Sequence, residues 1–379
     1  MVSCISSNMI KVMPVYLHHI ETLLPPTSYP QEEIAATLKR SVAKGDRRTE
    51  KIIHHLYAQS AIERRSSVVT DFLPDAEPGI FYDRATDAFL CPSTGARNAL
   101  YTEAARTMFP TIATRTLAAS GFAPEQLTHL ITVSCTGFFQ PGPDFAILKA
   151  LGLSAHVERY HLGFMGCYAA FPALRMAKAF CEANPEAVVL VVCLELCSLH
   201  VQWTASMDDL LAGSVFADGA SATVVSAREP QSTTGALRLD AFSSAIAPAG
   251  DSDMAWTIGD VGFQMRLSSY VPEIIQSNVK DAIQPILEKA VRTQEQVTHW
   301  AVHPGGRAIL DRVERGLDLP ESALAASREV LRNCGNMSSA TILFVLKELL
   351  SHGVAPEDTL LAMAFGPGLT IETALLTAL

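Results

Sequence analysis

A cysteine within the stretch Gly163–Phe171 has the setting of a catalytic nucleophile. Cys167 follows a Gly-Phe-Met-Gly turn and precedes an apolar, helix-forming run over residues 168–180. A thiol at the start of a helix faces unpaired backbone N–H groups and the positive end of the helix dipole, so its pKa should fall and its thiolate should be populated. The alternative is a buried structural cysteine, the commoner fate of a lone Cys among apolar residues. Catalysis at Cys167 therefore requires partner residues elsewhere in the chain.

Two later segments contain residues of the types that such a nucleophile needs. His303 ends an apolar run and precedes Pro-Gly-Gly, and Asn336 lies in a Gly-Asn-Met-Ser-Ser-Ala turn before the helix-forming run Ile342–Leu350. An imidazole can pair with a thiolate and an amide can donate to an oxyanion, and such partners are usually distant in sequence. Taken singly, His303 is explained as well by a structural role and Asn336 by helix capping. The order of all three motifs is much more specific than any one of them.

Together these motifs resemble those of the type III polyketide synthases, the chalcone and stilbene synthase family on the thiolase fold. The resemblance covers nearly the whole chain and extends to three further motifs, at Val133–Gly137, Phe216–Ala220 and Phe365–Thr373. The chain departs from the family pattern at Ala217 and Ala364, where the family has Gly. Each change adds only a methyl group, so we expect a small local adjustment of the backbone. By this resemblance, the family's catalytic triad falls on Cys167, His303 and Asn336.

The pattern of apolar residues indicates an α/β protein, because short β-rich runs alternate with helical patterns. The resemblance implies a thiolase-like five-layer αβαβα fold with two duplicated halves. We place the halves at residues 1–228, with the nucleophile Cys, and 229–379, with the His and Asn, since a polar stretch over residues 227–235 separates them. The predicted strands are Leu130–Val133, Ala187–Leu194, Ser221–Val225 and Leu361–Ala364, and the predicted helices include Thr102–Ser120 and Ile274–Ala290.

The resemblance also implies which residues line the substrate cavity. Phe216 matches the family's gatekeeper aromatic, and Met265 occupies the second gatekeeper position. The run over residues 195–201 resembles bacterial alkylpyrone and alkylresorcinol synthases, in which a side tunnel accepts a long acyl chain. This match favours fatty acyl starters, whereas ordinary core packing is the alternative interpretation. The full predicted set is Phe216, Met265, Cys135, Thr136, Cys197, Val201 and Trp256, with Thr136, Cys197 and Val201 along the tunnel.

A basic segment near the N-terminus is a candidate surface for coenzyme A. Between Lys39 and Arg65 there are eight Lys or Arg residues against three Asp or Glu residues. A solvated helix face is the ordinary explanation of such a run, and binding of the coenzyme's phosphates is the functional one. The predicted coenzyme A-binding residues are Arg64, Arg65, Gly305, Gly306 and Ala308.

Composition limits the other classes of function. The 379 residues carry a net charge of −10, which argues against general nucleic-acid binding, and 49% of them are hydrophobic, which argues against disorder. Eight scattered cysteines include no Cys-x-x-Cys pair or zinc spacing, so we expect free thiols, no metal and a cytoplasmic protein. No signal peptide is recognisable, and the longest aliphatic run, Ala187–Leu196, is too short to span a bilayer, so no stable membrane insertion is expected.

These observations predict an acyltransferase that condenses an acyl-CoA starter with malonyl-CoA and releases an alkylpyrone or alkylresorcinol. Both CoA esters act as substrates, so no cofactor is expected, and the resemblance implies a homodimer. A β-ketoacyl-ACP synthase III is the nearest alternative, with an acyl carrier protein as a possible donor. A hydroxymethylglutaryl-CoA synthase would need a catalytic carboxylate, for which Glu195 is available but is expected to be structural. A catalytically silent thiolase-fold scaffold is the alternative from a different class.

Overall fold

Strands that are buried along their whole length form the centre of the molecule. β8 (Val188–Leu196) and β9 (Asp218–Ser226) pair antiparallel, and every residue of both is buried. Their largely apolar or small side chains suit a sheet that is covered on both faces. The computed structural model describes residues 13–73, 75, 79–232, 235–248 and 253–379, in which nine strands form one sheet in the order β13-β14-β15-β10-β1-β9-β8-β6-β7.

The remaining elements are as follows. The other strands of the large sheet are β1 (Tyr16–Leu23), β6 (His129–Ser134), β7 (Glu158–Gly163), β10 (Leu237–Ile246), β13 (His299–Val302), β14 (Thr359–Gly366) and β15 (Thr370–Ala378). Short paired strands are β2 (Ser28–Pro30) with β3 (Arg64–Ser66), β4 (Tyr82–Asp83) with β5 (Ala88–Phe89), and β11 (Met254–Gly259) with β12 (Gly262–Leu267). The α-helices are α1 (Gln31–Leu38), α2 (Arg47–Ala58), α3 (Thr94–Ser120), α4 (Pro143–Leu151), α5 (Ala170–Ala183), α6 (Met207–Val215), α7 (Val271–Lys289), α8 (Arg307–Gly316), α9 (Ala325–Cys334) and α10 (Thr341–Ser351).

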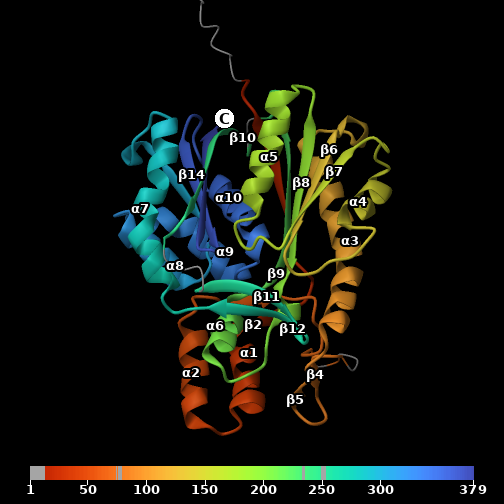
Figure 1. Cartoon of the computed structure of the whole chain (residues 1–379), viewed down its shortest axis with the longest axis vertical. Coiled ribbons are helices and arrows are strands. Elements are labelled where there is room, and N and C mark those ends of the chain that lie inside the picture. The colour runs from red at the N-terminus through yellow and green to blue at the C-terminus, as the bar shows by residue number, and fades with distance from the viewer. Residues whose placement is uncertain (1–12, 74, 76–78, 233–234, 249–252) are drawn as a thin grey trace, which may run out of the picture.

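Helices cover the outer faces of the sheet and fill the space between its two halves (Figure 1). α3 packs against β1, β8 and β9, α7 packs against β10 and β15, and α5 and α10 lie between the two halves. The halves are joined where β1 pairs with both β9 and β10. The two halves of the sheet form the two β layers. From one side of the molecule to the other the layers are therefore αβαβα, as the resemblance implied.

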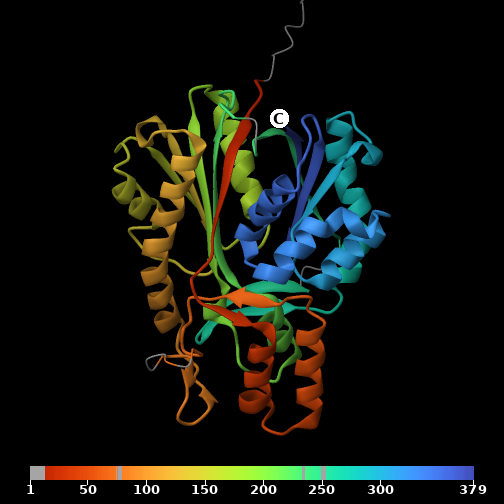
Figure 2. The same cartoon turned by 180° about the vertical axis from the view of Figure 1, so that it is seen from behind.

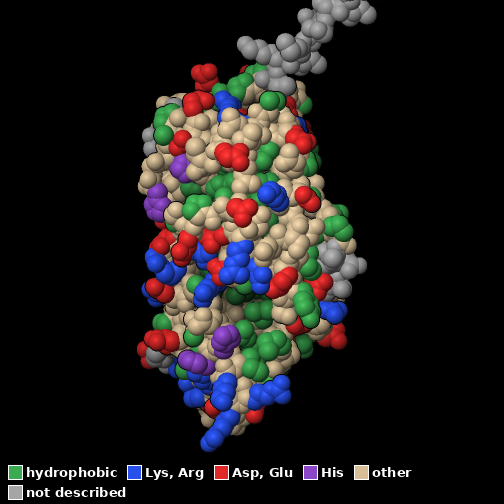
Figure 3. All heavy atoms as spheres, turned by 90° about the vertical axis from the view of Figure 1, so that its left-hand side faces the viewer, with side chains coloured by type: hydrophobic (Ala, Val, Ile, Leu, Met, Phe, Trp, Pro, Cys, Tyr) green, Lys and Arg blue, Asp and Glu red, His purple; other side chains and the backbone are tan. Residues whose placement is uncertain are grey.

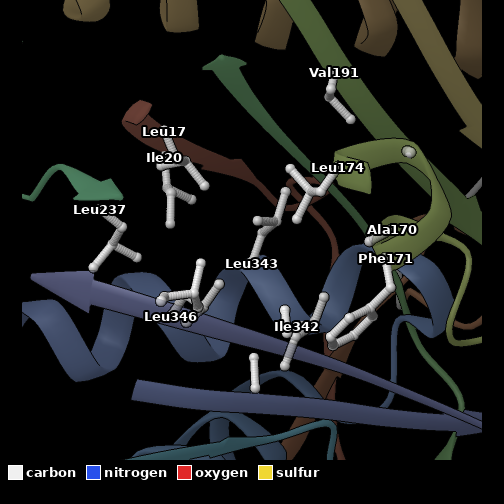
Figure 4. Packing of buried hydrophobic residues seen from close by; sticks show 14 of the residues in the cluster. Leu17, Ile20, Ala170, Phe171, Leu174, Val191, Leu237, Ile342, Leu343 and Leu346 are labelled. Carbon is white, nitrogen blue, oxygen red and sulfur yellow. The ribbon is translucent and has the colours of Figure 1, made fainter. Parts of the chain in front are cut away.

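The core between the halves is formed by apolar side chains from both buried helices (Figure 4). On each helix these side chains recur three or four residues apart, so they share one face. Strand residues close the core on either side, including Leu17 and Ile20 from β1 and Leu237 from β10. The helical contributors include Ala170, Phe171 and Leu174 of α5 and Ile342, Leu343 and Leu346 of α10.

One end of the large sheet carries the elements that surround the site described below. α1 and α2 project from this end, and the β11–β12 hairpin lies across it (Figures 1 and 2). Asp46 caps α2, since its side chain accepts hydrogen bonds from the backbone N–H groups of Arg48 and Thr49. α6 contacts both α2 and β12 of the hairpin, so these elements lie together although they are distant in sequence.

The predicted strands and helices are all present, and their ends differ by at most three residues except that α3 begins at Thr94, eight residues before its predicted start. The division into residues 1–228 and 229–379 stays a prediction; β9 ends at Ser226 and β10 begins at Leu237. In the described ranges, no helix is long and apolar enough to cross a membrane, and the cysteines are free. Residues 1–12 lie outside those ranges, so the predictions for Cys4 and for a signal peptide fall on residues that the structure does not describe. Residues 233–234 of the polar stretch over residues 227–235 lie outside them as well.

Candidate active site

Cys167 lies in a tight turn between β7 and α5. Gly166 adopts φ +97°, and a Cβ atom there would lie 2.5 Å from Pro367 Cδ, so both conformation and space favour glycine. The Gly166 N–H donates to Cys135 Sγ at 3.0 Å, which fastens the turn to the segment after β6. α5 begins at Ala170, so the thiol precedes the first turn of the helix. Cys167 is 8% exposed and lines a cavity.

His303 reaches the same cavity from the end of β13. Its backbone N–H donates to Met363 O in β14 at 2.8 Å, which fixes the main chain at that point. The side chain is buried, and among the described residues neither ring nitrogen has a hydrogen-bond partner. Buried polar atoms are rarely left unpaired. The His303 ring nitrogens are therefore available to a thiol or a substrate.

Asn336 is held by its backbone and by its side chain. Its N–H donates to Val215 O at 2.9 Å, and its carbonyl accepts from Ala217 N–H at 2.8 Å. Its Oδ1 accepts from Ser338 N–H at 2.8 Å, and its Nδ2 donates to Gly305 O at 3.3 Å. These contacts leave one Nδ2 hydrogen for the cavity. The structure therefore presents Asn336 as a fixed hydrogen-bond donor.

Burial dominates the acid–base properties of Cys167 and His303. It raises the pKa of Cys167 to about 11, and hydrogen bonds with the side chains of Ser338 and Asn336 offset this only in part. Burial likewise lowers the pKa of His303 to about 3. The expected fall of the thiol pKa at a helix start is therefore wrong in direction. A neutral imidazole beside a protonated thiol can accept the proton as sulfur attacks.

The raised pKa of Cys167 predicts a strong pH dependence of its alkylation. Below a pKa of about 11, the thiolate fraction rises about tenfold with each pH unit, so the rate with iodoacetamide should rise steadily above neutral pH. His303→Gln should leave the profile unchanged, because the histidine is already neutral there. Mass spectrometry of the peptide that contains Cys167 measures the rate. A plateau at or below neutral pH would instead show a thiolate–imidazolium pair in the free enzyme.

All three residues line one cavity of about 330 Å³, a size that suits a small-molecule site. Side chains from α2, α6, the β11–β12 hairpin and the loops after β13 and β14 form its walls. Every residue predicted to bind substrate lines it, namely Phe216, Met265, Cys135, Thr136, Cys197, Val201 and Trp256. Gly305, Gly306 and Ala308, which were predicted to bind coenzyme A, line it as well.

A stack of rings holds the hairpin over the cavity. The His200 and Phe263 rings stack with centroids 4.1 Å apart, and Phe263 N–H donates to His200 Nδ1 at 3.0 Å. His200 Nε2 then carries the proton and donates to Thr136 O at 2.7 Å, and burial keeps the ring neutral by lowering its pKa to about 4. Trp256 Nε1 donates to Cys135 O at 2.9 Å. These bonds fix the position of Trp256 in the wall of the cavity.

Glu195 is buried and has a structural role in this arrangement. Its carboxylate accepts from Cys135 N–H at 2.9 Å, from Thr136 Oγ1 at 2.8 Å and from the Ser339 hydroxyl. Burial raises the pKa of Glu195 to about 7. The side chain does not line the cavity. It therefore joins the loop after β6 to the segment after Asn336, as expected of a structural carboxylate.

Several residues of the site were not singled out from the sequence. Ser338 lines the cavity with φ +48°, and its hydroxyl lies within hydrogen-bonding reach of Cys167. Ser338 belongs to the same Gly-Asn-Met-Ser-Ser-Ala motif as Asn336, so the motif that could have identified it is visible in the sequence but was interpreted for Asn336 alone. Arg307 follows the Pro-Gly-Gly break, lines the cavity and is partly exposed. His55 and Gln59, near the end of α2, were also missed.

Arg64 and Arg65 do not line the cavity, and their predicted role in binding coenzyme A stays a prediction. Arg65 is 6% exposed, and its guanidinium donates to Gln31 Oε1 at 2.9 Å and to Phe216 O at 2.6 Å. Arg64 is exposed and donates to Ser28 Oγ at 3.0 Å. Successive residues of a strand point to opposite sides, which is why these neighbours differ. The guanidinium of Arg65 is thus buried and hydrogen-bonded within the protein.

Three findings describe what the site offers for chemistry. Within the described ranges, no cluster of three or more His, Cys, Asp or Glu side chains could hold a metal ion. Cys167 belongs to the first half of the chain, whereas His303 and Asn336 belong to the second. Their common cavity contains a thiol, an imidazole and a fixed amide, the groups needed for acyl transfer through an enzyme thioester.

Comparison with protein families agrees with this site. The model described as "Chalcone and stilbene synthases, N-terminal domain" matches residues 9–230, and "Chalcone and stilbene synthases, C-terminal domain" matches residues 238–379. The chain therefore belongs to the chalcone and stilbene synthase family. Its members are type III polyketide synthases, which are decarboxylative condensing acyltransferases. Membership supports a polyketide synthase over the alternative condensing enzymes.

Solved structures give the same result for the fold. The structure of PKS-I from the brown alga Ectocarpus siliculosus is similar, with a TM-score of 0.90 and 29% identity over 97% of this chain and 99% of that one. The C-terminal type III polyketide synthase domain of Steely1, a type I/III hybrid from Dictyostelium, has a TM-score of 0.86 and 24% identity over 96% and 99% of the two chains. The predicted thiolase-like fold is thus confirmed.

Proposed function

We propose that the enzyme loads an acyl-CoA starter on Cys167 and extends it with malonyl-CoA. Cys167 sulfur attacks the starter thioester, His303 accepts the thiol proton, and free CoA leaves with a proton. Loss of CO₂ from malonyl-CoA then leaves an enolate, to whose oxygen His303 and Asn336 donate hydrogen bonds. The enolate carbon attacks the acyl group on Cys167, which forms a β-ketoacyl-CoA and frees the sulfur. The convergence of these three side chains in one cavity carries the proposal.

The mouth of the cavity supports binding of the coenzyme A phosphates. Arg307 lies there, and its guanidinium donates to Gln59 Oε1 at 2.9 Å, which holds it beside His55 at the end of α2. Figure 3 shows Lys, Arg and His side chains around a hollow whose walls are partly hydrophobic. Phosphates favour such a cationic rim, whereas the apolar interior suits an acyl chain. Arg307 is thus a further candidate phosphate ligand beside the predicted Arg64.

A second cavity supports a fatty acyl starter. It has a volume of about 90 Å³ and lies behind Val201, Gly213 and Phe216, which line both cavities. Its walls include aromatic rings, and those of Phe89 and Trp203 stack with centroids 4.3 Å apart. A long acyl chain on Cys167 that passed Val201 would enter this space. A small starter would fill only the first cavity.

The remaining parts of the proposal concern product and assembly. Lactonisation of the extended chain would give an alkylpyrone, and aldol closure would give an alkylresorcinol. The chemistry proceeds with the two CoA substrates and without a cofactor, although an acyl carrier protein could deliver the starter instead of CoA. We further propose a cytoplasmic homodimer, which the family resemblance and the free cysteines of the described residues support.

Replacing Cys197 with phenylalanine should test the acyl path. Cys197 follows β8 in a 3-10 turn over Cys197–His200, which places it and Val201 on the cavity wall. An added aromatic ring cannot be absorbed by a close-packed wall without strain. Turnover of long acyl-CoA starters should therefore fall at least about tenfold, while acetyl-CoA and hexanoyl-CoA continue to react. Mass spectrometry of products from starters of graded length, with malonyl-CoA, measures this and identifies the ring type.

Val201→Ala is the matched variant, because it widens the passage to the second cavity. It should keep or increase long-chain turnover. Equal loss of all starters in Cys197→Phe would indicate misfolding, and unchanged long-chain turnover would mean that no acyl path passes Cys197. A wild-type enzyme that is inactive with every long starter would replace the fatty acyl proposal with a short-starter pyrone synthase.

A further inference from the structure

The end of α6 is held by four donors from separate parts of the chain. The last carbonyls of a helix have no partner within it, so they must be satisfied from outside. Tyr57 Oη donates to Gly213 O at 2.9 Å, and Gln31 Nε2 donates to Ser214 O at 2.7 Å. Asn336 N–H donates to Val215 O at 2.9 Å, and Arg65 Nη1 donates to Phe216 O at 2.6 Å. All four of these carbonyls belong to residues that line the cavity.

Arg65 connects several of these groups. Its Nε donates to Gln31 Oε1 at 2.9 Å, so the guanidinium and the amide together hold the carbonyls of Phe216 and Ser214. Its guanidinium carbon lies 5.8 Å from the centre of the Tyr57 ring. A nearby Asp218 carboxylate attracts the cation, but its oxygens accept hydrogen bonds from Ser198 and Val68. A cation at the end of a helix is also favoured by the helix dipole.

Arg65 reaches Asn336 by two routes. The first is the backbone, because Phe216 and Asn336 form a parallel β-bridge in which Ala217 N–H donates to Asn336 O at 2.8 Å. The second is direct packing on Gly335, which adopts φ +72°. A Cβ atom there would lie 2.9 Å from Arg65 Cγ and 3.0 Å from Val215 O. The residue before Asn336 thus lies closely against both the arginine stem and the end of α6.

We propose that Arg65 is a positioning residue for malonyl-CoA decarboxylation. It holds the carbonyl of Phe216 and thereby fixes the paired segments that carry Phe216 and Asn336. The inference rests on the proposed role of Asn336 as a donor to the enolate. An arginine suits this task because its planar fork reaches two acceptors in fixed directions, whereas a lysine presents a single ammonium. Loss of the hydrogen bond from Arg65 to Phe216 O would let the Asn336 amide move away from the enolate oxygen that it stabilises.

Arg65→Gln tests the inference through the rate of CO₂ release. The kcat for decarboxylation should fall about tenfold to a hundredfold, since a misplacement of about 1 Å can cost about that much. The KM for malonyl-CoA should change little, because Arg65 does not line the cavity mouth. Arg65→Lys should lose less activity, because it keeps the cation. Arg228→Gln, at a partly exposed arginine that pairs with Glu186 and lines neither cavity, should behave like the wild type.

A double mutant separates positioning from general destabilisation. In an Asn336→Ala background, Arg65→Gln should cost less than about twofold, because the group through which it acts is absent. Equal losses in both backgrounds would overturn the inference, as would full activity of Arg65→Gln with a damaged Asn336→Ala. If Arg65→Gln does not fold, Arg65→Lys is compared in the same two backgrounds. A fully active Asn336→Ala enzyme would overturn the proposed role of Asn336 itself, and with it this inference.

Discussion

Replacing Cys167 with alanine should abolish acyl loading while part of the malonyl-CoA decarboxylation remains. The thiol alone forms the covalent bond to the starter, so its loss removes the thioester intermediate completely. In the proposed mechanism the enolate, in contrast, is stabilised by His303 and Asn336, which reach the cavity from other elements. The variant should therefore release CO₂ and form acetyl-CoA from malonyl-CoA without making a condensation product. The two half-reactions are thus assigned to different residues of one cavity.

Intact-protein mass spectrometry after incubation with an acyl-CoA measures the loading step. Cys197→Ala is the control, because Cys197 is a buried cysteine that lines the same cavity and should leave loading intact. A stable acyl adduct on the Cys167→Ala protein would remove Cys167 as the nucleophile. Complete loss of decarboxylation in a folded Cys167→Ala protein would show that the thiol also takes part in enolate formation.

The convergence of Cys167, His303 and Asn336 on one cavity could be predicted because each residue has a local motif. Gly166 is required where the turn before Cys167 packs against Pro367, so the glycine beside the cysteine is visible in the sequence. His303 follows β13, which pairs in parallel with β14, and it precedes Pro-Gly-Gly. This strand end and the Pro-Gly-Gly break are likewise recognisable in the sequence. Close backbone approaches therefore mark the site in the sequence even where its three-dimensional arrangement is unknown.

The direction of the thiol pKa shift could not be predicted in the same way. The helix-start argument considered only the local backbone, whereas the pKa of Cys167 is raised chiefly by burial. Burial depends on the loop after β14 and on the hairpin, which come from the distant second half of the chain. The hairpin itself was not predicted, because Met254–Leu267 mixes polar and apolar residues without a simple period.

Arg65 shows a different limit of sequence analysis. Arg64 and Arg65 are adjacent and identical in type, and a charge run is usually explained by solvent exposure. Their difference depends on the three-residue strand β3, which pairs with β2 in a register that turns Arg65 inward. Composition contains no signal for this choice. The acceptors Phe216 O and Gln31 Oε1, which the structure brings together, explain why this arginine is buried.

Asn336 should have the largest effect on decarboxylation of any residue that is not the nucleophile. Removing one preorganised donor to an oxyanion typically costs about 10²–10³ in rate, or roughly 2.7–4 kcal/mol. Asn336→Ala should therefore lower CO₂ release by about that factor. His303→Gln should lose less, because its amide can still donate a hydrogen bond. The rates are best measured in the Cys167→Ala background, where condensation cannot obscure enolate formation.

Asn336→Asp distinguishes donation from mere support of the loop. Aspartate keeps an oxygen that can accept from Ser338 N–H, as Asn336 Oδ1 does at 2.8 Å, but it loses the Nδ2 donor. If donation matters, this variant should be at least as slow as Asn336→Ala, because an ionised carboxylate also repels the developing enolate. Near-normal CO₂ release by Asn336→Asp would mean that Asn336 only holds Ser338, and that Ser338 or His303 stabilises the enolate. The comparison therefore identifies which group in the cavity stabilises the negative charge of the enolate that forms when CO₂ departs.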